Sequence, residues 1–443
     1  MTRDEKTNLR RRGKHRDFCR HFDLPSKLLL KITLLAAYIA GAVYVSEKQD
    51  EVDAFMSALV VPAPLAEVIC SNLLRSYLLA GSIVLAVLLM YPFQRKMFTD
   101  GCLRIALTNA AGETPSLLRE RNDQNNRRVK IWEINNPGIP LKLWQDKQPE
   151  LEAVFDLNLI SVAYGLSTAR IILKYVSGRN VLPSHITWRD AYLSEDSFVL
   201  TLGEGYIGPV TVDLAKIPHI LLGGSTGSGK SVLLKLLLMQ ALHKGAEVYI
   251  ADFKGGVDFP PAWHERCRMC FEEEDLLELL TGLADELARR KRLFKEVGVP
   301  NLDEYNNVTE THLHRCIFAC DEVAEVLDKT GLSTEEKKLI GQIENKLSIL
   351  ARQGRAFGIH LILATQRPDA NLIPGQIRTN LGCRICGRAD SILSQIILDN
   401  TAAADQISKE ERGRFLLHDG TVFQGYWFEE QGLKGHGEYG SRD

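Results

Sequence analysis

Two long apolar runs stand out in the first hundred residues of the chain. Residues 28–45 are interrupted only by Lys31 and Thr33, and residues 77–93 contain no charged side chain. A helix over either run would measure about 26 Å, close to the roughly 30 Å of a bilayer's hydrocarbon core. The pattern predicts a transmembrane hairpin over residues 28–95. The alternative is a pair of helices buried in a protein core.

Lysine and arginine residues are distributed unevenly around this hairpin. The first 27 residues contain nine of them, whereas residues 46–76 contain only Lys48 and Arg75. Segments rich in these residues stay in the cytoplasm. The charges therefore predict that residues 1–27 form a basic cytoplasmic tail, that residues 46–76 lie outside, and that the C-terminus is also cytoplasmic.

From residue 216 onward, apolar runs alternate with segments of helical period. The runs at 219–222, 247–252, 315–320 and 360–366 predict strands, and residues 275–294 repeat apolar positions with the spacing of a helix. Such alternation is typical of an α/β domain with a parallel sheet between helices. A ligand of such a sheet binds at the carboxyl ends of the strands. Residues 96–204 are rich in turns and short strand-like runs, which predicts a small α/β connector.

Net charge and cysteine content give only weak indications of the binding partners and the cellular compartment. The formal net charge is −2, so no overall basic field favours nucleic acid, although a basic pore would not change this balance. Nine cysteines are scattered without a dense framework, which favours reduced thiols in a cytosolic compartment.

A phosphate-binding motif follows the first of the predicted strands of the α/β domain. Residues 224–231 read Gly-Ser-Thr-Gly-Ser-Gly-Lys-Ser and match G-x-x-x-x-G-K-[ST], with an apolar helical run after them. Glycines let backbone N–H groups surround phosphate oxygens at the N-terminus of a helix. Lys230 is expected to reach the β- and γ-phosphates, and the Ser231 hydroxyl to ligate Mg²⁺. The sequence thus predicts ATP and Mg²⁺ as cofactors, bound by Gly224, Ser225, Thr226, Gly227, Ser228, Gly229, Lys230, Ser231 and Asp321.

Two carboxylates end the strand predicted at 315–320. Asp321 is expected to complete the Mg²⁺ site, and Glu322 to orient and deprotonate an attacking water. The alternative is an edge strand that ends in solvated acids.

Two further candidates flank the last predicted strand. Gln366 ends it and is expected to sense the γ-phosphate, or else to be an ordinary hydrogen-bonding residue at a strand end. Arg352 and Arg355 precede it, and an arginine at either position could reach the γ-phosphate of a neighbouring subunit. A solvated helix face is the alternative for both arginines.

Several blocks together resemble the FtsK/SpoIIIE family of DNA translocases. They are residues 214–231, residues 251–256 with Phe253 where proline is usual, residues 286–294, and residues 351–368. The resemblance covers about residues 205–430 and implies a RecA-like P-loop ATPase domain that forms a homohexameric ring and pumps DNA through its pore. The resemblance implies the roles stated above for five residues, namely Lys230, Ser231, Asp321, Glu322 and Gln366. It also favours Arg355 as the arginine that reaches the neighbouring subunit's γ-phosphate.

The chain departs from the chromosome-segregating members of that family. It has two expected spans, a short connector and, in residues 431–443, only a short tail after the ATPase domain. This organisation is similar to that of FtsK-type coupling proteins of Gram-positive conjugative plasmids and transposons. The resemblance implies a translocase in the bacterial cell membrane that couples DNA to a relaxase and a membrane channel, with the strand state of the DNA left open. The alternatives are a chromosome or plasmid partitioning translocase and a type VII-like protein-secretion ATPase.

Overall fold

The computed structural model describes residues 24–47, 78–83, 93–124, 126–367 and 373–429, together with the single residues 51, 75 and 85. The chain divides into two compact units. One comprises residues 1–119, 133–147 and 164–171, and the other comprises residues 120–132, 148–163 and 172–443.

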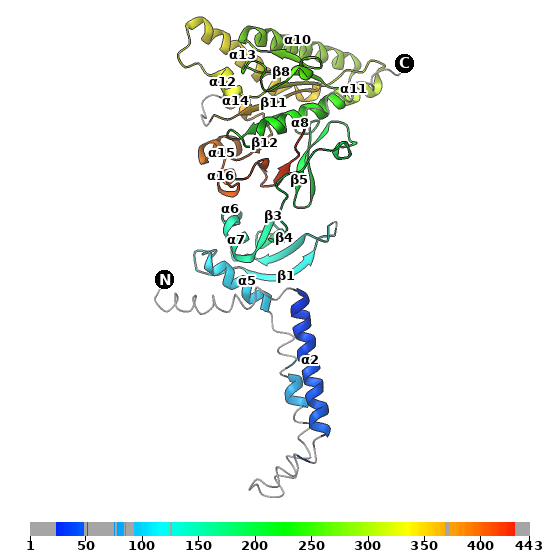
Figure 1. Cartoon of the computed structure of the whole chain (residues 1–443), viewed down its shortest axis with the longest axis vertical. Coiled ribbons are helices and arrows are strands. Elements are labelled where there is room, and N and C mark those ends of the chain that lie inside the picture. The colour runs from blue at the N-terminus through cyan, green and yellow to red at the C-terminus, as the bar shows by residue number, and fades with distance from the viewer. Residues whose placement is uncertain are drawn as a thin grey trace. The chain divides into compact units, whose positions relative to one another are not determined.

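The larger unit contains a ten-stranded sheet (Figure 1) with the strand order β6-β5-β14-β13-β12-β7-β11-β10-β8-β9. Its strands are β5 Val199–Gly205, β6 Gly208–Asp213, β7 Ile220–Gly223, β8 Glu247–Ala251, β9 Arg268–Cys270, β10 Cys316–Cys320, β11 Ile359–Thr365, β12 Cys383–Cys386, β13 Arg414–Leu417 and β14 Val422–Gly425. The six strands from β12 to β9 pair in parallel. The predicted strands β7, β8, β10 and β11 all belong to this parallel part.

The predicted parallel sheet is thus present, and the other four strands extend it in a way that the sequence did not predict. β13 pairs with β12 and β14, and β5 pairs with β14 and β6, all antiparallel. Short turns join β5 to β6 and β13 to β14, and a turn of a few residues can join only antiparallel strands. The sheet is therefore mixed, with an antiparallel extension beside the parallel core.

Helices cover both faces of the parallel core because its strands are apolar on both sides. Ile317 and Ala319 of β10 pack in one buried cluster with leucines of α8 (Lys230–His243). Phe318 packs on the opposite face with α10 (Glu273–Val297) and α13 (Thr334–Gln353). Side chains of a strand alternate between faces, so one strand supplies both clusters.

The ends of the two long helices are set by local sequence. α10 ends at Val297 and is followed by Gly298, whose φ of 80° favours glycine. A capping box starts α13, in which the Ser333 side chain accepts from the backbone of Glu336 and the Glu336 side chain accepts from the backbone of Ser333. Of these two helices, α10 also carries Arg289 and Arg290, which are discussed below.

The remaining described helices are α5 (Phe93–Arg104), α6 (Leu141–Asp146), α7 (Gln148–Phe155), α9 (Pro261–His264), α11 (Leu302–Val308), α12 (Val323–Leu327), α14 (Gly375–Arg378), α15 (Ser391–Leu398) and α16 (Ala402–Gln406), with short 3₁₀ turns η1 (Asp190–Tyr192) and η2 (Arg355–Phe357). A second, four-stranded sheet has the order β1-β2-β4-β3. Its strands are β1 Ser116–Asn122, β2 Lys130–Asn135, β3 Leu157–Tyr164 and β4 Arg170–Ser177.

The first predicted span coincides with a helix, α2 (Leu24–Glu47). Its Tyr38 hydroxyl donates to the Leu78 carbonyl at 2.8 Å and lies 2.9 Å from Ser82 Oγ, so the two apolar segments contact each other. In the part of the chain that the structure describes, no helix is both long and apolar enough to cross a membrane. Much of the second predicted span, nearly all of the basic tail and the tail 431–443 fall outside the described residues.

Candidate functional site

The phosphate-binding motif forms a loop between β7 and α8. β7 ends at Gly223 and α8 begins at Lys230. Gly227 and Gly229 have φ values of 75° and 100°, which disfavour any residue with a side chain. A Cβ at Gly229 would lie 3.1 Å from Gly413 Cα, so the loop also needs glycine there for close packing.

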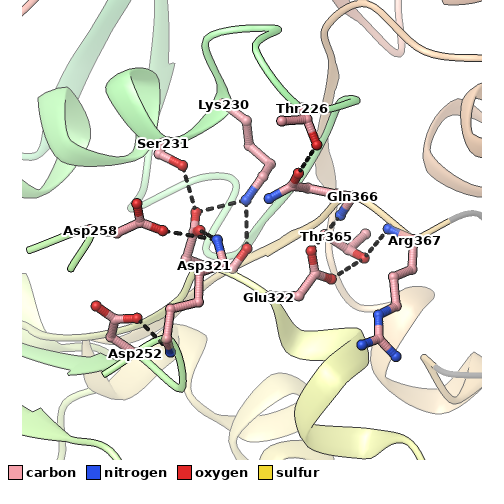
Figure 2. Close-up of polar contacts among 11 residues, drawn as sticks. Thr226, Lys230, Ser231, Asp252, Asp258, Asp321, Glu322, Thr365, Gln366 and Arg367 are labelled. Atoms are coloured by element: carbon pink, nitrogen blue, oxygen red, sulfur yellow. Dashed lines mark hydrogen bonds and ion pairs between the residues drawn. The ribbon is translucent and has the colours of Figure 1, made fainter. Parts of the chain in front are cut away.

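Asp321 is the centre of the polar network at the carboxyl ends of the strands (Figure 2). It follows β10, and its side chain is 2 % exposed. The Lys230 ammonium donates to Asp321 Oδ1 at 2.7 Å and to the Asp321 carbonyl at 2.6 Å, and the Ser231 hydroxyl donates to Oδ1 at 3.1 Å. The structure therefore brings together three residues that the sequence placed in one site.

Lys254 contacts the second oxygen of the same carboxylate. Its ammonium lies 2.9 Å from Asp321 Oδ2 and 2.8 Å from Asp258 Oδ2. The sequence had given Lys254 no role of its own in the site. Lys254 follows the end of β8 by three positions, so the rule that placed the site at strand ends was the available signal.

The charges of this cluster shift two carboxyl groups in opposite directions. Burial raises the pKa of Asp321, but the ammonium groups of Lys230 and Lys254 outweigh it and hold the pKa below its usual value. Burial raises the pKa of Asp252, and the neighbouring carboxylates Asp258 and Asp321 raise it further. Asp252 Oδ2 is buried without a hydrogen-bond partner among the described residues.

Glu322 is held by the neighbouring strand. Its Oε1 accepts from the Thr365 hydroxyl at 2.7 Å, and its Oε2 accepts from the backbone N–H of Gln366 at 2.8 Å. The residue is 8 % exposed. Two fixed donors thus orient a carboxylate at the edge of the site, where a general base would be needed.

Gln366 connects this strand end to the phosphate-binding loop. Its Oε1 accepts from the Thr226 hydroxyl at 2.8 Å, and β11 pairs with β7 along the sheet. One hydrogen bond therefore links the carboxyl end of β11 directly to the loop.

Arg388 is a second residue that the sequence did not single out. Its guanidinium donates to the Thr226 carbonyl at 2.6 Å and to the Lys409 carbonyl at 2.6 Å. β12 is the parallel neighbour of β7, and Arg388 lies two residues beyond its carboxyl end. Its position just after a strand end was the available signal, but nothing in the four-residue strand β12 indicates that it pairs with β7.

Arg355 does not lie with the other predicted site residues. It begins the turn η2 before β11, whereas Glu322 and Gln366 lie at the far end of that strand. Seven residues of extended chain separate the two ends by about 20 Å. An arginine side chain is too short to cross that distance, so the exposed Arg355 lies out of reach of the nucleotide site of its own subunit.

The residues present fit a nucleoside triphosphate and its cation. The loop offers backbone N–H groups at the start of α8 and a lysine that is 3 % exposed, and Ser228 Oγ is buried without a partner among the described residues. Ser231 and Asp321 contribute the hard oxygen donors that Mg²⁺ prefers. In this structure Lys230 neutralises Asp321, so binding of a triphosphate would require Lys230 to exchange that carboxylate for phosphate oxygens.

Comparison with known proteins supports a motor domain in this region. Residues 187–370 match the FtsK/SpoIIIE family model. The DNA translocase FtsK of Helicobacter pylori is 30 % identical over 231 residues, which are 49 % of this chain and 26 % of that protein. The DNA translocase SftA of Bacillus subtilis is 31 % identical over 214 residues, 45 % of this chain and 21 % of that protein. The chain thus spans about a quarter of the length of these relatives.

One solved structure corresponds to much more of the chain. The pCW3 conjugation coupling protein TcpA, in a monomer form with ATPγS, is 37 % identical with a TM-score of 0.57. The match covers 76 % of this chain and 96 % of that one. The likeness therefore extends beyond the residues that match the family model.

Proposed function

Because this chain belongs to the FtsK/SpoIIIE family and contains its ATPase domain, we propose that it is a membrane-anchored, ATP-driven DNA translocase that acts as a coupling protein in conjugative DNA transfer. The observation that carries the proposal is the similarity to the coupling protein TcpA, at 37 % identity over nearly the whole of that chain. The curated relatives named FtsK and SftA support the broader activity of a DNA translocase.

The site residues divide the work of hydrolysis among them. Lys230 binds the β- and γ-phosphates, and Ser231 and Asp321 hold Mg²⁺, which neutralises phosphate charge when bound. Glu322 accepts a proton from the attacking water, in the orientation that Thr365 and Gln366 fix for it. Gln366 is suited to report loss of the γ-phosphate because it is hydrogen-bonded to Thr226 of the loop.

A ring of identical subunits, which we expect to be a homohexamer, completes the site. Arg355 lies at the opposite end of β11 from Gln366 and has an exposed side chain. In a ring it would supply positive charge to the neighbouring subunit's γ-phosphate. DNA would pass through the ring, and a relaxase and channel proteins would be the partners at the membrane.

Membrane anchoring is part of this proposal. The apolar runs 28–45 and 77–93 and the nine basic residues before residue 28 support two spans in a bacterial cell membrane with both termini in the cytoplasm. The contact of Tyr38 with Leu78 and Ser82 is compatible with a helical hairpin.

ATP hydrolysis in the presence of DNA tests the translocase activity. We expect single- or double-stranded DNA to stimulate hydrolysis by the full-length protein in detergent, and the stimulation to weaken with added salt because phosphate contacts release counterions. Rings should be verified in the same samples by light scattering. If verified rings hydrolyse ATP equally with and without DNA at low salt, the protein-secretion alternative is favoured instead.

A genetic test separates conjugation from partitioning, the second candidate that the relatives named as DNA translocases support. In donor cells whose only copy carries Glu322→Gln, transfer of the mobile element should fall by orders of magnitude while cell division and element retention stay normal. Normal transfer combined with loss of the element from dividing cells would identify a partitioning translocase.

A further inference from the structure

A buried arginine of α10 is hydrogen-bonded to the backbone of the turn that carries Arg355. Arg290 is 2 % exposed and its guanidinium donates to the Phe357 carbonyl at 2.7 Å, within the turn η2. The same guanidinium donates to the His314 carbonyl at 2.8 Å, just before β10. One side chain thus ties the turn to the start of the neighbouring strand.

Arg290 is itself held in place. Its Nε lies 2.6 Å from Glu286 Oε1, one helical turn away on α10. A guanidinium has its donors in a rigid planar fork, so two carbonyls and one carboxylate fix its position and orientation. Lysine has no such fork and cannot replace all three bonds.

Packing adds to these bonds on the same side of the turn. The rings of Phe294 and Phe357 are stacked with centroids 5.2 Å apart, and the Lys291 ammonium lies 5.9 Å from the centroid of Phe357. Gly358 ends the turn with a φ of 68°, and a Cβ there would lie 2.3 Å from Leu302 Cδ2. The backbone of η2 therefore has little freedom on the side facing α10 and α11.

The other side of the turn is open. Arg355 and Ala356 line a cavity of about 390 Å³ together with Asp303 and Arg315. Arg315 is ion-paired with Asp303 at 2.6 Å, whereas the Arg355 side chain has no hydrogen bond or ion pair among the described residues. The turn thus combines a fixed backbone with an exposed cation beside an open space.

We infer that Arg290 is a positioning residue for Arg355, and that it fixes the turn so that Arg355 is presented to the nucleotide of the next subunit. This inference rests on the proposed trans role of Arg355. The rate of reaction is sensitive to errors of about 1 Å in the position of a catalytic group. A residue that fixes the backbone beneath Arg355 therefore raises the rate although it does not itself contact the nucleotide.

The first test compares two adjacent arginines. Arg290→Met should lower ATP turnover by about 10- to 100-fold, the range expected for a misplaced catalytic group, with nucleotide affinity unchanged. Arg289→Met is the matched control: Arg289 pairs with the same Glu286 at 2.6 Å but is 47 % exposed and has no bond to the turn. The control should retain the parent rate. Equal rates in Arg290→Met and the parent, with Arg355→Ala inactive, would overturn the inference.

Mixed rings distinguish positioning from a general loss of folding. Arg290→Met mixed with Lys230→Ala should regain activity, because the Lys230→Ala subunit presents an intact turn to its neighbour's nucleotide. Arg290→Met mixed with Arg355→Ala should regain none, because both lack the same function. Restoration in the second mixture, or none in the first while Arg355→Ala with Lys230→Ala is restored, would refute the inference. If Arg355→Ala alone hydrolyses ATP normally, the trans role in the proposed function is wrong instead.

Discussion

The Lys230 ammonium and the Asp321 carboxylate are bound to each other at 2.7 Å in the folded chain, with both side chains at most 3 % exposed. Nucleotide binding must replace this ion pair, since the same ammonium is needed at the phosphates. Lys230→Ala should therefore abolish ATP binding, measured with a fluorescent ATP analogue. The substitution should also lower the free energy of unfolding. Removing one partner of a buried ion pair costs about 3–5 kcal/mol of stability, and the remaining Lys254–Asp321 contact should reduce that loss.

The control for this variant is Lys216→Ala. Lys216 is 82 % exposed, and its ammonium lies 3.0 Å from nearby Asp213 Oδ2. It should bind the analogue as the parent does and melt at nearly the same temperature. Undiminished binding by Lys230→Ala would mean that residues 224–231 do not form the phosphate site.

Glu322→Gln should bind ATP but turn it over about 10²–10⁴-fold more slowly, the usual contribution of a general base. The amide keeps the shape and can still accept the bond from Thr365 or Gln366, but it cannot take a proton. Single-turnover hydrolysis and nucleotide binding should be measured on the same sample. Glu325→Gln, an exposed residue on the first turn of α12, is the control. Hydrolysis at the parent rate would exclude Glu322 as the base.

The sequence was sufficient to predict those site residues that lie at the carboxyl ends of recognisable strands. Apolar runs identify β7, β10 and β11, and parallel pairing brings their carboxyl ends to one edge. That is why Lys230 meets Asp321, 91 positions further along the chain, and Thr226 meets Gln366, 140 positions further along. The P-loop motif follows the carboxyl end of β7 and therefore marks this edge of the sheet as the one that binds the ligand.

Other contacts depend on long-range geometry that no local pattern encodes. Lys254 reaches Asp321 only because β8 is the neighbour of β10, and Arg388 reaches Thr226 only because β12 is the neighbour of β7. Strand order follows from the packing of the whole sheet. The four-residue strands β13 and β14 are also too short for periodicity alone to separate them from loops. β7 is equally short, but the P-loop motif that follows it identifies it.

The membrane hairpin gives a prediction about topology. Residues 46–76 should lie outside the cytoplasm, because only two basic residues occur there and nine precede residue 28. A cysteine introduced at Ala58, in a variant with Cys19 and Cys70 replaced by serine, should react with a membrane-impermeant thiol reagent in intact cells. A cysteine at Ser26 should react only after lysis. The reverse pattern would invert the topology and place the ATPase domain away from cytoplasmic ATP.

A buried pair of histidines predicts how stability depends on pH. Arg315 Nη1 lies 3.2 Å from His360 Nε2, and since arginine only donates, His360 is neutral and donates from Nδ1 to the Pro218 carbonyl. His219 accepts from the backbone of Leu361 through its own Nδ1. Burial lowers the pKa of His219 to about 4, and burial together with Arg315 lowers the pKa of His360 to about 3.

Both shifts make the folded chain less stable in acid. An unfolded histidine, with a pKa near 6.5, takes up a proton between pH 7 and pH 5, whereas these two remain neutral in the folded state until near pH 4. Each should therefore lower the free energy of unfolding by about 2 kcal/mol between pH 7 and pH 5. Stability rises with pH across this window, because the unfolded state binds more protons.

His219→Asn should reduce this pH dependence by about half. Asparagine can accept the bond from Leu361 and does not titrate, so the drop in melting temperature from pH 7 to pH 5 should shrink by roughly 4–8 °C, at about 2–4 °C per kcal/mol for a domain of this size. Melting of the nucleotide-free full-length protein at the two pH values measures it. His418→Asn, at an exposed position, should leave the drop unchanged. An equal drop in His219→Asn and the parent would show that His219 is protonated in the folded state as readily as in the unfolded chain.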